Sequence, residues 1–169
     1  MLNAALEREL AAIHAQSFGW ALACTGRDQE RARDVLQEAY AKVWAGRADW
    51  DRRSTFKTWF FGVVRLTALE HRRWSLRAWL GLTSDGVEVA DDAPSPSSAL
   101  DRGIRARALA RALTRLAPRQ REVLHLTFYE ELTLREAAVI MGIAIGSART
   151  HYERGKESLF RILNEQEKS

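Results

Sequence analysis

Cysteine is nearly absent from this chain of 169 residues, which contains only Cys24. A single cysteine cannot close an internal disulfide, so a small disulfide-stapled fold is excluded. The histidines are also few and lie far apart, at positions His14, His71, His125 and His151. Because their spacing matches no metal site, we expect neither a metal ion nor a cofactor.

Long hydrophobic runs are absent as well. No segment reaches the roughly 18 apolar residues of a membrane helix, and Arg65 interrupts the most apolar stretch, Trp59–Leu69. The first 25 residues carry charged side chains where a signal peptide needs its apolar run. With 46% hydrophobic and 28% charged residues, the composition is globular. We therefore expect a cytoplasmic protein without membrane insertion.

Lysine is scarce, since 22 of the 26 basic residues are arginine. Arginine is the better reader of phosphates and base edges, but a genomic bias in composition explains the excess equally well. The charge is also unevenly spread: residues 1–75 carry +3, residues 76–101 carry −4 and residues 102–169 carry +5. Two basic lobes around an acidic middle indicate a polyanionic partner that contacts both ends.

The acidic middle of the chain also reads as a domain boundary. The stretch from Gly81 to Ser98 is rich in Gly, Ser, Asp and Pro, and Pro94 and Pro96 exclude a continuous helix there. The flanking regions have helical periodicity. We predict an all-α protein with an N-terminal helical bundle at 1–77, a flexible acidic linker at 78–99 and a C-terminal helix-turn-helix domain at 100–169.

The N-terminal lobe is predicted to contain three helices. The first covers residues 3–24, the second is capped by Asp28, and the third runs from Phe56 to about Trp74 after a cap at Ser54 or Thr55. The second helix leaves on its outer face the polar residues Arg31, Asp34, Gln37, Glu38 and Lys42.

The third predicted helix is apolar on all sides of its first half and basic at its end. Such a helix is typical of a buried central position, in which Phe56 and Trp59 belong to the core. The same composition also fits an aromatic surface beside a basic stripe, which stacking on unpaired bases requires. The sequence leaves both interpretations open.

The C-terminal lobe has the pattern of a helix-turn-helix. Pro118 opens a helix in which we expect Val123, Leu124, Thr127 and Phe128 to be buried. Thr133 and Glu136 form a capping box for a short helix that stops at Gly142. A longer helix follows from about 146 to 163, as in DNA-binding helix-turn-helix domains.

A helical wheel divides the last helix into two faces. Ala148, Tyr152, Gly155, Leu159 and Ile162 are expected to face the core. The opposite face could read a major groove, with Arg149 and Arg154 pairing with guanine and Glu153 accepting from cytosine. The alternative is a solvated face on an ordinary helical hairpin.

Four stretches of the sequence are distinctive when taken together. They are RARDVLQEAYAKVW (Arg31–Trp44), STFKTWFFGVVRLTALEHRR (Ser54–Arg73), LAPRQREVLHLTFYEELTLREAAVIMG (Leu116–Gly142) and GSARTHYERGKESL (Gly146–Leu159). These stretches resemble the extracytoplasmic-function (ECF) sigma factors, the short two-domain branch of the bacterial sigma factors. The order matches that family over nearly the whole chain. The resemblance implies a protein that binds core RNA polymerase and directs it to promoter DNA, under the control of an anti-sigma factor.

The resemblance also implies roles for individual residues. The residues that would contact the coiled coil of the polymerase β′ subunit are Asp34, Gln37 and Glu38. Those that would capture and hold the minus-ten element are Asp51, Arg52, Arg53, Ser54, Thr55, Trp59, Arg65, Arg72 and Arg73. Those that would recognise the minus-thirty-five element are Ser147, Arg149, Thr150, His151, Glu153 and Arg154. The C-terminal lobe would also contact the β flap, and the linker would thread the RNA channel.

Three features depart from the family pattern. Leu66 and Glu70 stand where members usually have Asn and Asp, which predicts altered minus-ten contacts. Ser147 and Ala148 replace the usual Thr-Val. Gly155 replaces the usual Ala, which predicts a last helix stiffened by DNA or a partner, because glycine weakens a helix interior.

A different class of protein also accommodates the C-terminal pattern, namely a free-standing helix-turn-helix repressor or activator. Such a protein normally dimerises to match paired half-sites, and no segment here is an obvious dimer helix. It would also leave the Asp34–Glu38 face without a role. An enzyme is not expected, because the sequence contains no phosphate-binding loop, metal-ligand spacing or nucleophile elbow.

Overall fold

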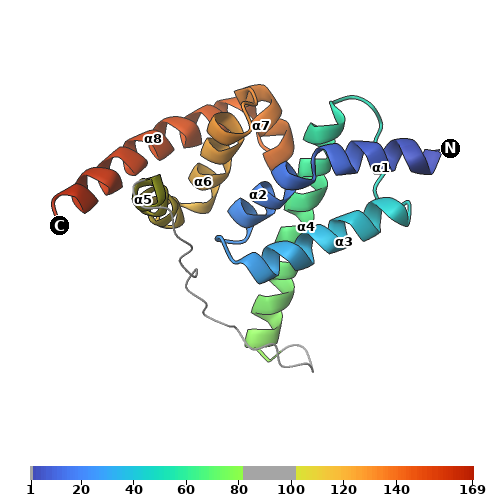
Figure 1. Ribbon diagram of the computed structural model, residues 1–169, viewed down its shortest axis with the longest axis horizontal. Helices are drawn as coiled ribbons and strands as arrows, with labels where there is room; N and C mark the ends of the chain where they lie inside the picture. Colours follow the sequence, from blue (N-terminus) through green and yellow to red (C-terminus); the bar gives the residue numbers. More distant parts are fainter. Residues whose placement is uncertain (1, 82–101) are drawn as a thin grey trace. The chain divides into compact units, whose positions relative to one another are not determined.

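The computed structural model describes residues 2–81 and 102–169. The chain divides into two compact units, Met1–Ala93 and Pro94–Ser169, and the regular secondary structure of their described residues is helical (Figure 1). The predicted linker at 78–99 lies outside the described residues except for its start. Within the described part of the chain, no helix has both the length and the apolar character needed to cross a bilayer.

The N-terminal unit begins with two helices where the sequence predicted one. Helix α1 (Leu2–Ala12) and helix α2 (His14–Cys24) meet at Ile13, whose ψ of 9° departs from helical geometry. The Ser17 hydroxyl donates to the Ile13 carbonyl oxygen over 2.7 Å and stabilises the start of α2. Periodicity continues through this break, which is why the apolar pattern alone did not reveal it.

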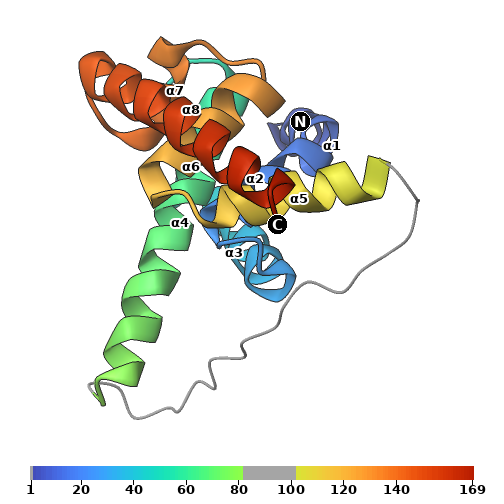
Figure 2. The same ribbon diagram turned by 90° about the vertical axis from the view of Figure 1, so that its left-hand side faces the viewer.

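Helices α3 (Gln29–Trp44) and α4 (Phe56–Trp79) complete this unit and pack against α2 and each other. The predicted cap of α3 is confirmed, because the Asp28 carboxylate accepts from the Arg31 amide over 3.0 Å. Thr55 rather than Ser54 caps α4, accepting from the Thr58 amide over 3.2 Å. Figures 1 and 2 show that the C-terminal half of α4 projects beyond α2 and α3. Helix α4 is therefore five residues longer than predicted.

The core of the N-terminal unit is built around Trp20, Phe60 and Phe61, whose side chains are fully buried. The Trp20 indole stacks on Phe61 at 5.8 Å between ring centroids and donates to the Phe61 carbonyl oxygen over 2.9 Å. This satisfies the one polar group of a buried indole. Of the two interpretations that the sequence left open for the first half of α4, the structure favours the buried central helix for Phe60 and Phe61.

The C-terminal unit consists of α5 (Arg102–Thr114), α6 (Pro118–Leu124), the π-helical turn η1 (His125–Tyr129), α7 (Leu134–Met141) and α8 (Ile145–Glu167). Helix α8 contacts α5, α6 and α7, so it organises the unit. The capping box of α7 is confirmed by Glu136 N to Thr133 Oγ1 at 3.1 Å and Thr133 N to Glu136 Oε2 at 2.9 Å. Gly142 ends α7 with a φ of 64°.

The π-helical turn corrects the expected burial after Pro118. Val123 and Leu124 are buried as predicted, but Thr127 is half-buried and Phe128 is 58% exposed. A π turn adds a residue and rotates the following side chains relative to an α-helix. His125 and Leu126 consequently take the buried positions.

Gly155 has a packing role that the sequence analysis did not foresee. It is buried where α8 crosses α6, and a Cβ atom there would lie 3.2 Å from Gln120 Cβ and from Leu124 Cδ1. The missing side chain lets the two helices approach closely. The contact with α6 thus supports α8 at the position where we expected support from DNA or a partner.

Candidate nucleic-acid interface

Helix α8 exposes the face that the sequence predicted to read the major groove of DNA, called the reading face below. Ala148, Gly155 and Ile162 are buried, whereas Tyr152 and Leu159 are half-buried. Exposed on the other side are Ser147, Arg149, Thr150, Glu153 and Arg154, and His151 is half-buried at the margin. Because the core stripe is on the opposite side, these side chains are available to a ligand without any change in packing.

Two contacts order this face of α8. The Thr150 hydroxyl donates to the Gly146 carbonyl oxygen over 3.0 Å, and Glu153 pairs with Lys156 at 3.3 Å. The Lys156 ammonium also lies 4.4 Å from the centre of the Tyr152 ring, which stacks on Phe128 at 6.0 Å. The helix therefore carries a half-buried aromatic contact immediately beside its polar face.

The loop predicted to capture a minus-ten base is ordered by its own contacts. The Asp51 carboxylate accepts from the Arg53 amide over 3.0 Å, and Arg52 has a left-handed φ of 61°. The Trp50 indole donates to the Ser54 carbonyl oxygen over 3.0 Å. Asp51, Arg52, Arg53 and Thr55 are exposed and Ser54 is half-buried. The loop thus holds polar groups at the surface in a defined shape.

Sequence reasoning missed Trp50, which anchors this loop. Its ring lies 5.3 Å from that of Phe56, edge to face, and 6.5 Å from that of Trp59, while the Arg52 guanidinium lies 5.4 Å from its centre. The available signal was an aromatic residue within an otherwise polar loop. Phe56 is buried, which confirms its core assignment, whereas Trp59 is half-buried between core and surface.

Helix α4 brings only part of its predicted basic set to the surface. Arg72 and Arg73 are exposed. Arg65, in contrast, is only 7% exposed. Leu66 takes the surface position instead, at 59% exposed. Arg65 faces the bundle because α4 is buried around most of its circumference in this half.

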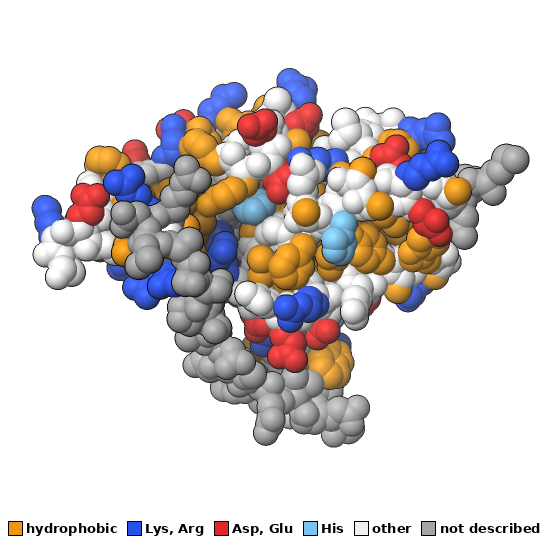
Figure 3. All heavy atoms as spheres, in the orientation of Figure 1, with side chains coloured by type: hydrophobic (Ala, Val, Ile, Leu, Met, Phe, Trp, Pro, Cys, Tyr) orange, Lys and Arg blue, Asp and Glu red, His pale blue; other side chains and the backbone are white. Residues whose placement is uncertain are grey.

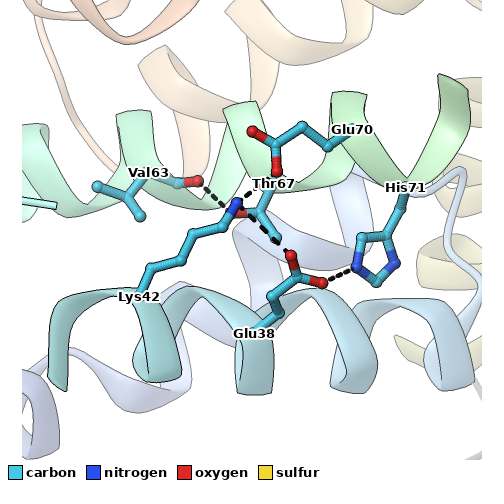
Figure 4. Close-up of polar contacts among 6 residues, drawn as sticks. All are labelled: Glu38, Lys42, Val63, Thr67, Glu70 and His71. Carbon is cyan, nitrogen blue, oxygen red and sulfur yellow. Dashed lines mark hydrogen bonds and ion pairs between the residues drawn. The ribbon is translucent and has the colours of Figure 1, made fainter. Parts of the chain in front are cut away.

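The three residues predicted to dock on polymerase share one face of α3, but they are not equivalent. Asp34 and Gln37 are exposed. Glu38 is half-buried, and its carboxylate contacts both the Lys42 ammonium, at 3.6 Å, and the His71 ring of α4 (Figure 4). Burial by itself raises the pKa of Glu38, but the hydrogen bond and charge of His71, aided by Lys42, outweigh it and lower that pKa.

A surface hollow of about 370 Å³ lies between α2 and α3, and Gln37, one of the residues predicted to dock on polymerase, lines it. It is lined by His14, Phe18, Arg33, Leu36, Gln37 and Tyr40. His14 Nδ1 and the Tyr40 hydroxyl are 2.7 Å apart, and burial raises the pKa of Tyr40. Figure 3 shows hydrophobic side chains at the surface over α2 and α3. This face can accept a partner with both apolar and polar groups.

No metal centre accompanies these surfaces in the ranges 2–81 and 102–169, where no three His, Cys, Asp or Glu side chains gather around a common point. The polar groups that these surfaces present include arginines, hydroxyls and amides on helices and on one ordered loop. Arginines, hydroxyls and amides can bind a polyanion through hydrogen bonds and, for arginine, through charge.

Comparisons with known proteins match both units to one family. Residues 12–79 match the family model "Sigma-70 region 2" and residues 106–159 match "Sigma-70, region 4". The ECF RNA polymerase sigma factor SigF of Caulobacter vibrioides is 34% identical over 127 residues, which cover 75% of this chain and 67% of that protein. SigL of Mycobacterium tuberculosis is 31% identical over 156 residues, 89% of this chain and 85% of that protein.

A solved structure has the same architecture. The sigma factor RpoE from Bartonella quintana, crystallised with the anti-sigma factor NepR, superposes with a TM-score of 0.75 at 25% sequence identity. The match covers 94% of this chain and 96% of that one.

Proposed function

This chain belongs to the ECF family of RNA polymerase sigma factors, and from that premise we propose how its surfaces divide the work of promoter recognition. The N-terminal unit docks on core polymerase and holds the opened minus-ten element. The C-terminal unit reads the duplex of the minus-thirty-five element. The chemistry of nucleotide addition belongs to the polymerase, and the protein acts in the cytoplasm, where polymerase and promoter are.

One observation supports this division most strongly, namely the two-sided character of α8. Its exposed face carries Arg149, Glu153 and Arg154, while its buried face anchors it to the rest of the unit. A recognition helix needs these two properties together, because its register in the groove must not depend on the side chains that read bases. Arginine pairs bidentately with guanine, and glutamate accepts from the amino group of cytosine.

The minus-ten surface in this proposal combines the ordered loop Asp51–Thr55 with the exposed half of α4. The loop would take up a base that has left the stack, at a cost of a few kcal/mol that polar contacts and the nearby Trp59 offset. Arg72 and Arg73 would contact phosphates of the held strand. Arg65 is left out of this surface because it is buried.

The docking surface is proposed on α3, with Asp34 and Gln37 as the direct contacts. Both are exposed, and Gln37 lines the hollow between α2 and α3. Glu38 belongs to the same face, but its carboxylate already contacts Lys42 and His71. A charge reversal at Glu38 would therefore disturb the packing of α3 on α4 as well as docking. Asp34 is the cleaner position for a test.

An anti-sigma factor is the second proposed partner. The related RpoE was solved with the anti-sigma factor NepR bound to it. A chain with two separate units offers such a regulator two surfaces to hold at once, and the avidity of a two-point grip exceeds that of either contact.

The test is run-off transcription with core polymerase on a pool of promoters, followed by sequencing of the selected templates. We expect Asp34→Arg to abolish polymerase binding, and the exposed Glu7→Arg, which changes the net charge equally, to leave it unchanged. A free-standing repressor would ignore core polymerase and would direct no transcription. That result would overturn the proposed function.

A further inference from the structure

Lys42 is the centre of a polar cluster between α3 and α4, although periodicity assigns it to the outer face of α3. Its ammonium group donates to Thr67 Oγ1 over 3.0 Å and to Glu70 Oε2 over 2.5 Å, and lies 3.6 Å from Glu38 Oε1 (Figure 4). The side chain is only 16% exposed. Two of the three ammonium donors thus have an acceptor, and Glu38 adds an ion pair.

The buried end of this cluster is fully satisfied. Thr67 has no exposed surface, and its hydroxyl donates to the Val63 carbonyl oxygen over 2.8 Å while it accepts from Lys42. Lys42 is therefore directed toward α4 by a buried acceptor. The second oxygen of Glu38 contacts His71, one helical turn further along α4 (Figure 4).

Glu70 is at the exposed end of the cluster, and its position gives the cluster a function. Its side chain is 57% exposed, on α4 between the exposed Leu66 and Arg73. This half of α4 is the surface proposed to hold the opened minus-ten strand. A carboxylate there would repel phosphates unless a cation neutralised it, because charges of the same sign a few ångströms apart interact unfavourably even at a protein surface.

We propose that Lys42 is a positioning residue for minus-ten recognition: it neutralises the Glu70 carboxylate on the half of α4 that holds the strand. This inference rests on the proposed function, in which α4 holds the opened minus-ten strand. If the inference holds, the charge of this surface of α4 depends on Lys42, a residue of α3. Lys42 itself contacts neither DNA nor polymerase in this arrangement.

The competing interpretation is that Lys42 only fastens α3 to α4. The two roles differ in their dependence on charge. If Lys42 only fastens the helices, its substitution weakens DNA binding at every salt concentration, and a second substitution at Glu70 does not restore binding. If Lys42 neutralises Glu70, its substitution leaves the Glu70 charge unpaired. Removing that charge then restores DNA binding, and high salt masks the loss.

The experiment compares Lys42→Met, Glu70→Gln and the double variant in holoenzyme with core polymerase. The probe is a fluorescent fork-junction DNA made from the best template of the promoter selection, with its minus-ten element single-stranded. We expect Lys42→Met to weaken fork binding by about tenfold at low salt, and the double variant to return within about threefold of wild type. The matched control is Lys168→Met, which removes the same charge at an exposed position.

Three outcomes overturn the inference: an unchanged affinity of Lys42→Met, a double variant as weak as the single one, or a loss that stays constant between about 50 and 500 mM salt. If Lys42→Met does not fold, Glu70→Gln alone decides. We expect it to bind the fork at least as tightly as wild type, and weaker binding contradicts the inference. Failure of the wild-type holoenzyme to bind the fork would refute the proposed function instead.

Discussion

The two units of this sigma factor differ in how closely their functional side chains are tied to their packing. In the C-terminal unit, the proposed reading face of α8 and its core face are on opposite sides. In the N-terminal unit, α3 and α4 would contact polymerase and DNA, and they are also joined by ion pairs. These pairs involve Glu38, Lys42, Glu70 and His71. Substitutions at the surface of α8 should therefore act locally, whereas substitutions in α3 and α4 should act on more than one property.

The means of stabilisation differ as well. The N-terminal unit depends on large aromatic side chains, with Trp20 and Phe61 stacked and hydrogen-bonded at its centre. The core of the C-terminal unit is aliphatic, and the Thr133 capping box, the left-handed Gly142 and the close approach at Gly155 direct its backbone. Large rings stabilise by buried area, whereas caps and glycines stabilise by geometry. The units should consequently respond to different kinds of mutation.

The largest effect is expected from Trp20→Ala. It removes a fully buried ring and a buried hydrogen bond, and should destabilise the N-terminal unit by about 3–5 kcal/mol. All six tryptophans lie in residues 1–81, so tryptophan fluorescence in a denaturant titration follows this unit alone. Trp44→Ala, at a 43% exposed position, is the control and should cost far less. Equal losses would contradict the central role of Trp20.

Arg154→Ala tests the independence of the α8 reading face. We expect relaxed preference at one base pair, worth about 1–3 kcal/mol, with no change in the stability of the fold. The measurement is competition binding of the holoenzyme to templates that differ at single positions of the minus-thirty-five element. Arg161→Ala, exposed two turns further along α8, should leave the preference intact. Uniform losses on all templates would instead make Arg154 a phosphate contact.

A pair of glycine substitutions should have effects of opposite sign. Gly155→Ala places a Cβ 3.2 Å from Leu124 and should destabilise the C-terminal unit by about 1 kcal/mol. Gly62→Ala in α4 meets nothing within 4 Å and should stabilise the N-terminal unit by about 0.5–1 kcal/mol. Hydrogen exchange of the amides in each unit measures both. A stabilising Gly155→Ala would show that α6 and α8 have room to separate.

The smallest effect is the pH dependence that comes from Glu38. Because its pKa is lowered in the folded state, its contribution to stability is complete above the ordinary value of 4.5 and is lost as the pH falls through the lowered value. The contribution is small, since the side chain is 40% exposed. Denaturant titrations by tryptophan fluorescence should show wild type losing its advantage over Glu38→Gln below about pH 4.5. An advantage that grows on acidification would contradict the assigned ion pairs.

Local signals predicted the parts of this structure that depend on neighbours in sequence. The caps at Asp28 and Thr133 and the stop at Gly142 were correct, because each involves groups within a few residues. The two faces of α8 were also predictable, since one stripe of small and apolar residues defines them. The break at Ile13 and the π turn at His125–Tyr129 were not, because the apolar pattern continues through both.

The sequence by itself determined the helical class, the two-part organisation, the family and the exposed and buried faces of α8. Only the tertiary structure decided that Arg65 is buried and that Trp50 anchors the loop. It also decided that α6 packs closely on α8 at Gly155 and that Lys42 connects α3 to α4. The physical reason is common to these four cases. A helical period tells which residues share a face, but burial and pairing depend on the element that comes to lie against that face.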